Sequence, residues 1–145
     1  MGTLAAMSRV STYLNFMGQT EEAFTFYASV FGTSAGPAFR MGDMGGPDLR
    51  EDEKQLIGHI ELPILAGHVL MGTDMLESMG HQLRVGNNVT INLEIDSRQE
   101  TDRLYAALSE GGSESSPPQD MPWAYWGVTL DRFSIRWMFN GPAAA

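Results

Sequence analysis

The chain has 145 residues, a length typical of one domain that buries about two thirds of the surface its unfolded chain would expose. It contains no cysteine, which excludes disulfides, thiolate metal sites and cysteine nucleophiles. Eighteen acidic residues against nine basic ones give a net charge of -9, and this balance argues against nucleic acid and anionic membranes as partners.

The first half of the chain predicts a strand, a helix and three more strands. Residues 10–16 alternate in hydropathy, which places Thr12 on the same side as Leu14 and Phe16. A helix follows, with Thr20 as its predicted N-cap and Gly32 as its end. The later strands are predicted at 37–41, 56–62 and 68–73, with a mobile loop at 42–53 where glycine and proline are frequent.

The second half repeats this order. Residues 89–95 form the clearest strand, in which Asn92 and Glu94 alternate with apolar residues. Ser97 with Glu100 three residues later is a capping box, and it opens a helix that reaches Gly111. A loop with Pro117 and Pro118 then leads to strands predicted at 123–129 and 133–140.

The repeated order defines the organisation of the chain. We expect an α+β fold in a single domain at 9–140, made of two βαβββ modules at about 9–75 and 87–140. Residues 1–8 are expected to be disordered and 141–145 to form a tail. The start of the chain lacks the basic and apolar parts of a signal peptide, and no apolar run approaches the roughly 20 residues of a spanning helix, so we expect a cytoplasmic protein.

Four motifs then occur in the order found in a known family. They are Tyr13-Leu-Asn-Phe followed by Glu21-Glu-Ala-Phe-Thr-Phe-Tyr27, then Gly58-His-Ile-Glu-Leu62, then Leu70-Met-Gly-Thr-Asp74, and Trp126-Gly-Val-Thr-Leu-Asp-Arg-Phe-Ser-Ile-Arg-Trp-Met-Phe-Asn140. With Gly86-Asn-Asn88, they make residues 10–140 resemble the PhnB-like branch of the glyoxalase, bleomycin-resistance and extradiol-dioxygenase superfamily, the vicinal oxygen chelate proteins. The resemblance implies two βαβββ modules that form a curved mixed sheet around an open cavity, a small-molecule ligand and a homodimer.

Metal enzymes of that superfamily hold a divalent ion with one His or Glu from each of four strands. The resemblance places these positions at Thr12, Met71, Thr90 and Arg136. A methionine is too soft for such a site and an arginine repels the cation, so we expect no metal at these positions. We also expect no other cofactor. Members of the branch are often labelled demethylubiquinone methyltransferase-like, but no glycine-rich turn between a strand and a helix is present to hold S-adenosylmethionine.

His59 and Glu61 are the best candidates for catalytic residues. They stand two apart on one predicted strand, so they point the same way and could hold a divalent metal with Glu94. The alternative, which we favour, is that His59 belongs to a hydrogen-bond network and Glu61 pairs with an arginine. Arg136 either binds a carboxylate or phosphate or pairs with Glu94 or Glu61, and we favour the ion pair because a buried unpaired guanidinium is costly.

Three functions follow, and whether the protein is an enzyme stays open among them. The first is binding or turnover of a small organic molecule in the cavity between the modules, with His59 or Glu61 as proton carrier. The second is non-catalytic sequestration of a cationic or aromatic compound, and the third is a dimer scaffold with a filled cavity. A metal-dependent lyase or isomerase at His59 and Glu61 is a further alternative. The expected cavity residues are Thr12, His59, Glu61, Met71, Thr90, Asn92, Glu94, Trp126 and Arg136.

Overall fold

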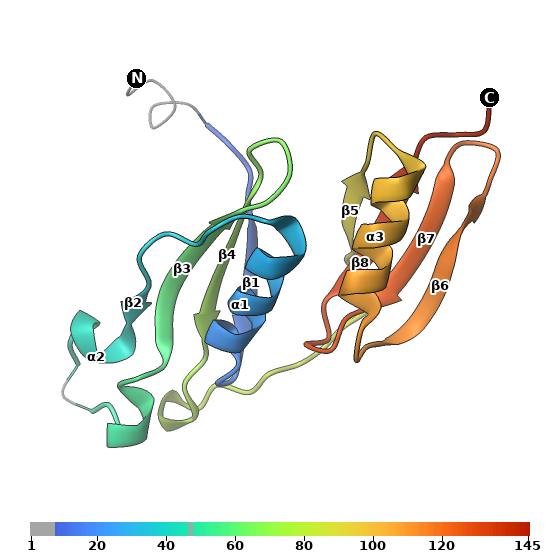
Figure 1. Ribbon diagram of the computed structural model, residues 1–145. Helices are drawn as coiled ribbons and strands as arrows, with labels where there is room; N and C mark the ends of the chain where they lie inside the picture. The colour runs from blue at the N-terminus through green and yellow to red at the C-terminus, as the bar shows by residue number, and fades with distance from the viewer. Residues whose placement is uncertain (1–7, 47) are drawn as a thin grey trace, which may run out of the picture. The chain divides into compact units, whose positions relative to one another are not determined.

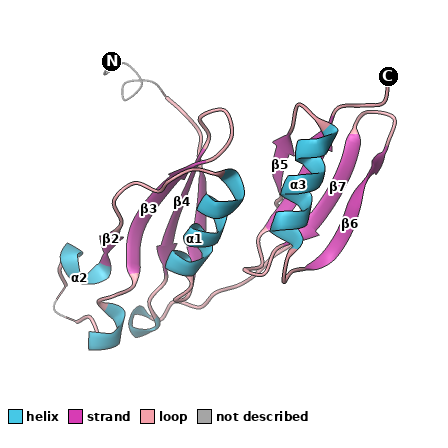
Figure 2. Cartoon of the chain, in the orientation of Figure 1, coloured by secondary structure: helices cyan, strands magenta, loops and turns pink. Residues whose placement is uncertain are grey.

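A computed structural model describes residues 8–46 and 48–145, and the chain divides into two compact units. The first unit ends at Leu83, and the second runs from Arg84 to Ala145. Each unit contains a four-stranded mixed sheet and one long helix (Figures 1 and 2). The predicted α+β fold with two βαβββ modules is confirmed. The predicted disorder at residues 1–8 lies, except for Ser8, outside the described residues.

The first unit has the sheet order β1-β4-β3-β2. Strands β1 and β4 pair in parallel, and the other neighbours are antiparallel. The predicted loop at 42–53 is partly helical. The elements are β1 (Thr12–Phe16), α1 (Thr20–Phe31), β2 (Phe39–Arg40), α2 (Met41–Met44), η2 (Glu51–Glu53), β3 (Ile57–Pro63), β4 (Val69–Asp74) and η3 (Glu77–Met79).

Helix α1 packs on one face of this sheet. The predicted N-cap was wrong: Gln19 holds that position without a side-chain cap, and Thr20 is the first helical residue. Gly32 ends the helix in the left-handed conformation, as predicted. Phe24 lies so close to Gly72 of β4 that a Cβ at Gly72 would come within 2.5 Å of the ring. The glycine therefore lets the helix approach the sheet.

The second unit has the sheet order β5-β8-β7-β6, with β5 and β8 parallel. The predicted loop at Pro117 and Pro118 is in fact strand, and it forms an edge of the sheet with shifts in register. An edge tolerates proline because half of its backbone groups need no ladder partner. The elements are β5 (Ile91–Glu94), α3 (Arg98–Ser109), β6 (Ser113–Asp120), β7 (Tyr125–Leu130) and β8 (Arg136–Gly141).

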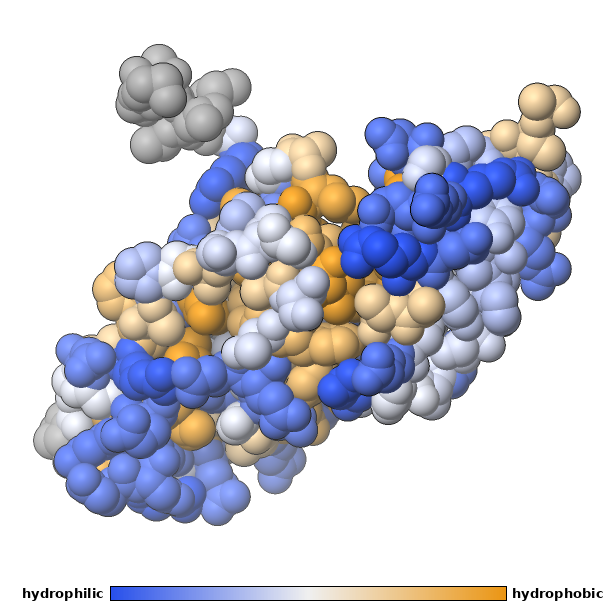
Figure 3. Space-filling view, in the orientation of Figure 1, coloured by the Kyte–Doolittle hydropathy of each residue, from blue (hydrophilic) through white to orange (hydrophobic). Residues whose placement is uncertain are grey.

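Helix α3 packs on one face of the second sheet in the same way. Ser97 is its N-cap, and the hydroxyl accepts a hydrogen bond of 3.0 Å from the backbone N–H of Glu100. Thr101 packs against Gly141 of β8, and the outer surface of the helix is hydrophilic (Figure 3). Strand β8 begins later than predicted because residues 131–135 form a turn, in which Ser134 has a φ of 68°.

Candidate functional site

Each sheet has one face under its helix and one open face. In β4, Leu70, Gly72 and Asp74 are buried, so Met71 points to the opposite side. The sheet register brings further side chains to that side, because Met71 pairs with Tyr13 and with Glu61, while Phe39 pairs with His59. We call Tyr13, Phe39, His59, Glu61 and Met71 the first open face.

His59 is hydrogen-bonded through both ring nitrogens on this face. Its Nδ1 lies 2.8 Å from the Tyr13 hydroxyl, and its Nε2 lies 2.9 Å from Oε2 of Glu61. Arg9 approaches the other oxygen of Glu61 at 3.9 Å. Burial and, secondly, the negative charge of Glu61 raise the pKa of the Tyr13 hydroxyl above its ordinary value. The local arrangement is thus the network with an arginine partner that the sequence favoured.

These residues do not fit a divalent metal. Tyr13 and Glu61 form hydrogen bonds with the two ring nitrogens of His59, so neither nitrogen is open to a metal in this arrangement. No three His, Asp or Glu residues in the described part of the chain gather as a metal-binding group. The family position in β1 is held by Thr12, which lies on the helix-covered side with its hydroxyl 2.9 Å from Nε2 of His68. The donor sets therefore differ from those of divalent sites.

The second sheet gathers four of the predicted residues on its open face. Trp137 and Phe139 of β8 are buried toward α3, so Arg136 and Asn140 point the other way. Asn140 pairs in register with Glu94 and Trp126. Thr90 precedes the first residue of β5. We call this side the second open face; its residues are Asn92, Glu94, Trp126, Arg136, Met138 and Asn140.

A hollow of about 510 Å³ lies along the second open face. Asn140 donates a hydrogen bond of 2.6 Å from Nδ2 to Oδ1 of Asn92, while its own Oδ1 is buried without a hydrogen-bond partner among the described residues. Glu94 forms no ion pair with any basic residue of residues 8–46 and 48–145. Trp123 is 61% exposed. The lining residues are Asn92, Glu94, Trp123, Ala124, Asn140, Gly141, Pro142 and Ala143.

Arg136 does form an ion pair, but the predicted partners were wrong. Its Nη2 lies 3.3 Å from Oε1 of Glu114, in the edge strand β6. The pairing follows from the register, since Leu130 faces Arg136 on one side and Ser113 on the other. The guanidinium is therefore neutralised locally by Glu114, and Arg136 is not the partner of Glu94.

A second hollow, of about 460 Å³, lies in the first unit and is mainly apolar. Met41, Met44 and Met79 line it with Leu49 and Leu76. None of the predicted site residues lies there. Methionines grouped in a glycine-rich segment are the only sequence signal for it, and such residues are usually core.

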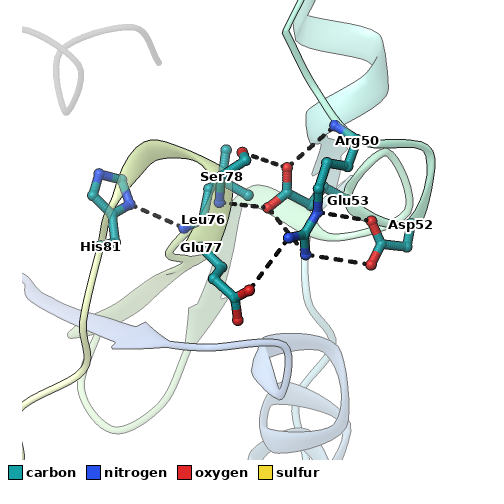
Figure 4. A network of polar contacts seen from close by, with 7 residues as sticks. All are labelled: Arg50, Asp52, Glu53, Leu76, Glu77, Ser78 and His81. Carbon is teal, nitrogen blue, oxygen red and sulfur yellow. Dashed lines mark hydrogen bonds and ion pairs between the residues drawn. The ribbon is translucent and has the colours of Figure 1, made fainter.

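A polar network joins the segments beside this hollow (Figure 4). The buried Glu53 accepts a hydrogen bond of 2.5 Å from the Ser78 hydroxyl and another of 3.3 Å from the backbone N–H of Arg50. The Ser78 hydrogen bond is the main cause that lowers the pKa of Glu53. His81 accepts a hydrogen bond of 2.9 Å from the backbone N–H of Leu76. This network fixes η2 and η3 against each other.

The sequence missed Tyr13, Asn140 and Trp123 as site residues. Strict alternation in β1 would have found Tyr13, because Thr12 shares its side with the buried Leu14 and Phe16. The sequence predicted Trp123 at the start of a strand at 123–129, but β7 begins only at Tyr125, so the predicted alternation does not apply to Trp123.

Comparisons with known proteins give one matching family and several similar structures. A family model described as 3-demethylubiquinone-9 3-methyltransferase matches residues 8–139. A solved protein of Pseudomonas aeruginosa is 30% identical, with a TM-score of 0.82, and the match covers 95% of this chain and 100% of that one. A PhnB protein of Bacillus cereus is 21% identical, with a TM-score of 0.74 and coverage of 92% and 99%. No curated protein matches the sequence.

Structures with lower sequence identity share the fold of this chain. A glyoxylase/bleomycin resistance protein/dioxygenase domain from Frankia is 12% identical, with a TM-score of 0.67 and coverage of 96% and 95%. At this identity the likeness shows the fold alone, and it confirms the glyoxalase-like fold expected from the sequence. No helix in the described residues has the length and apolar character needed to cross a bilayer.

Proposed function

The chain belongs to the PhnB-like family, the 3-demethylubiquinone-9 3-methyltransferase-like proteins, and on that premise we propose that it binds a small planar organic cation on its second open face. The observation that carries this proposal is the hollow of about 510 Å³ in which Glu94, which has no ion-pair partner within the described ranges, lies beside two amide side chains. Binding sites of small molecules typically have volumes of about 300–1,000 Å³ and a few polar groups that fix the ligand.

Each lining group favours one feature of the ligand. The Glu94 carboxylate attracts a positive charge and accepts hydrogen bonds. The amides of Asn92 and Asn140, which are joined by a hydrogen bond of 2.6 Å, are polar groups that can fix the orientation of a ligand. The exposed ring of Trp123 offers a face on which a planar cation can stack. Together they favour an aromatic or conjugated cation, as in the sequestration hypothesis.

The family description names a methyl transfer, which we do not propose for this chain. That reaction needs a methyl donor, and the sequence has no glycine-rich turn between a strand and a helix that could hold S-adenosylmethionine. We propose binding without a metal, because the donor sets at His59 and at the family positions are not those of a divalent site.

We also propose, from the family resemblance, a cytoplasmic homodimer. Sedimentation of the purified protein would measure the number of chains per particle.

Binding of a charged and an uncharged ring compound tests the proposal. We expect N-methylquinolinium to quench the tryptophan fluorescence saturably, and Glu94→Gln to weaken its binding about tenfold, as the loss of one charge-assisted contact would. Quinoline, which is uncharged at neutral pH, should bind the wild type and the variant within about twofold of each other. Affinity should not change when a chelator is added.

Glu110→Gln is the matched control, because this exposed carboxylate lies in the same unit outside the hollow. It changes the net charge by the same amount as Glu94→Gln and should leave binding unchanged. The proposal is wrong if the cation does not bind, if both variants weaken it equally, or if the chelator abolishes binding.

A further inference from the structure

The first open face carries an arrangement that the proposed function does not use. The ring centroids of Tyr13 and His59 are 5.6 Å apart, and those of Phe39 and His59 are 6.4 Å apart. Tyr13 is 44% exposed and Phe39 is 56% exposed. The rings of Tyr13 and Phe39 are tilted by 35° and 39° to that of His59, and the three neighbouring rings form a shallow platform on which a planar group can rest.

The hydrogen bonds on this platform fit the proton arrangement of a neutral imidazole beside an ionised carboxylate. An ionised carboxylate only accepts, so Nε2 of His59 carries a proton and donates it to Glu61. A neutral imidazole then has Nδ1 as its acceptor, and the Tyr13 hydroxyl donates to it. The lone pairs of the Tyr13 oxygen remain available to a ligand. The order of groups is that of a catalytic triad, with a phenol in place of the usual alcohol.

We propose that Tyr13, His59 and Glu61 form a proton relay that accepts a proton from the hydroxyl group of a ring compound resting on Phe39. In the step, the ligand O–H bond breaks and its proton binds the Tyr13 oxygen. The proton of Tyr13 passes to Nδ1 of His59 at the same time. The products are a ligand oxyanion and an imidazolium, so atoms and charge balance without a further reactant.

The surroundings suit both products. The Glu61 carboxylate lies 2.9 Å from Nε2 and stabilises the positive imidazolium. Because burial and the charge of Glu61 raise the pKa of Tyr13, its hydroxyl keeps the proton in the resting state. Phe39 and Met71, which flank the relay, carry no hydrogen-bond donor that would compete for the Tyr13 oxygen.

A simple phenol with a visible ionised form provides the test. We would titrate 4-nitrophenol with the protein at a pH below the midpoint of the free phenol and follow the absorbance of its anion. The wild type should raise the ionised fraction saturably. Tyr13→Phe keeps the ring, so it should preserve binding within about twofold by equilibrium dialysis, yet lower the ionised fraction of the bound phenol about tenfold. Glu61→Gln should lower it to an intermediate degree.

Tyr105→Phe is the matched control, since it removes a hydroxyl from a tyrosine that packs on Phe139 in the second unit. It and Glu94→Gln should leave ionisation unchanged, which separates the relay from the binding function proposed above. The relay is overturned if 4-nitrophenol neither binds nor ionises, if Tyr13→Phe ionises it as the wild type does, or if Tyr105→Phe has the same effect as Tyr13→Phe.

Discussion

The two units share one topology but place their buried aspartates differently. In the first unit, Asp74 ends β4 and accepts hydrogen bonds from the backbone N–H groups of Gly18, Thr20 and Ile57 and from the Thr20 hydroxyl. In the second unit, Asp131 follows β7 and accepts from Phe133, Ile135 and the Trp137 indole. Both aspartates are 3% exposed.

The difference follows from how each helix begins. The first N–H groups of a helix need acceptors. Ser97 supplies one for α3 from its own side chain, whereas Gln19 supplies none for α1. Asp74 therefore reaches from the sheet to cap α1, whereas Asp131 holds the turn before β8 and the buried Trp137 indole. Two units with the same topology can therefore place a buried aspartate differently, because the residue at the start of each helix differs.

Removing the two aspartates should have the largest effects. Asp74→Ala leaves three buried donors and one part-buried donor unpaired and should lower the free energy of unfolding by about 4 kcal/mol. Asp131→Ala loses the hydrogen bonds from Phe133 and Ile135 within its turn and from the Trp137 indole, and it should cost about 2–3 kcal/mol. Urea unfolding followed by circular dichroism measures both.

Smaller substitutions test single groups at the N-termini of α1 and α3. Thr20→Val removes one donor to Asp74, and Ser97→Ala removes the cap of α3; each should cost about 1 kcal/mol. Thr25→Val removes an exposed hydroxyl that donates to the Glu21 carbonyl and should cost less than either. An equal or larger loss for Asp131→Ala than for Asp74→Ala would contradict the assigned roles.

The next largest effect should be a difference between the two units in how strongly acid pH lowers the free energy of unfolding. Since the folded pKa of Glu53 is lowered, its stabilisation is present above the unfolded pKa and is lost as the pH falls through the folded pKa. Asp120 in the second unit has the same sign, but its ion pair with Arg98 is exposed and solvent weakens it. Glu53→Gln should therefore flatten the dependence of unfolding on acid pH more than Asp120→Asn does.

Denaturant midpoints measured from neutral pH down through the carboxyl range would show this difference. Glu77→Gln is the matched control, because it also removes a negative charge near Arg50 but from an exposed side chain. A pH profile that Glu53→Gln leaves unchanged would contradict the role of the Glu53 network.

Much of the fold was accessible from the sequence because alternation and helical spacing are local signals. The open side of β5 followed directly from Asn92 and Glu94. Strand β6 did not, since two prolines mask an edge strand that only its pairing with β7 defines. The partner of Arg136 depends on the same pairing, because register between distant segments is not encoded in either one alone.

The smallest expected effects concern the coupling energies of one exposed ion pair in each unit. Arg40 holds Glu21 in the first unit through both terminal nitrogens, at 3.1 and 2.6 Å, and also donates to the Gln55 carbonyl. Arg136 contacts Glu114 at 3.3–3.4 Å, and its Nε is buried without a partner in the described part of the chain. Better geometry should give the first pair the stronger coupling.

Double-mutant cycles with Arg40→Met and Glu21→Gln, and with Arg136→Met and Glu114→Gln, would measure the two couplings. We expect about 0.5–1 kcal/mol for the first pair and about 0.2–0.5 kcal/mol for the second, since solvent screens both. Arg136→Met alone should be nearly neutral, because it also removes the unsatisfied Nε. A loss above about 2 kcal/mol would instead mean that Arg136 has a buried partner whose loss is costly, as in a desolvated pair.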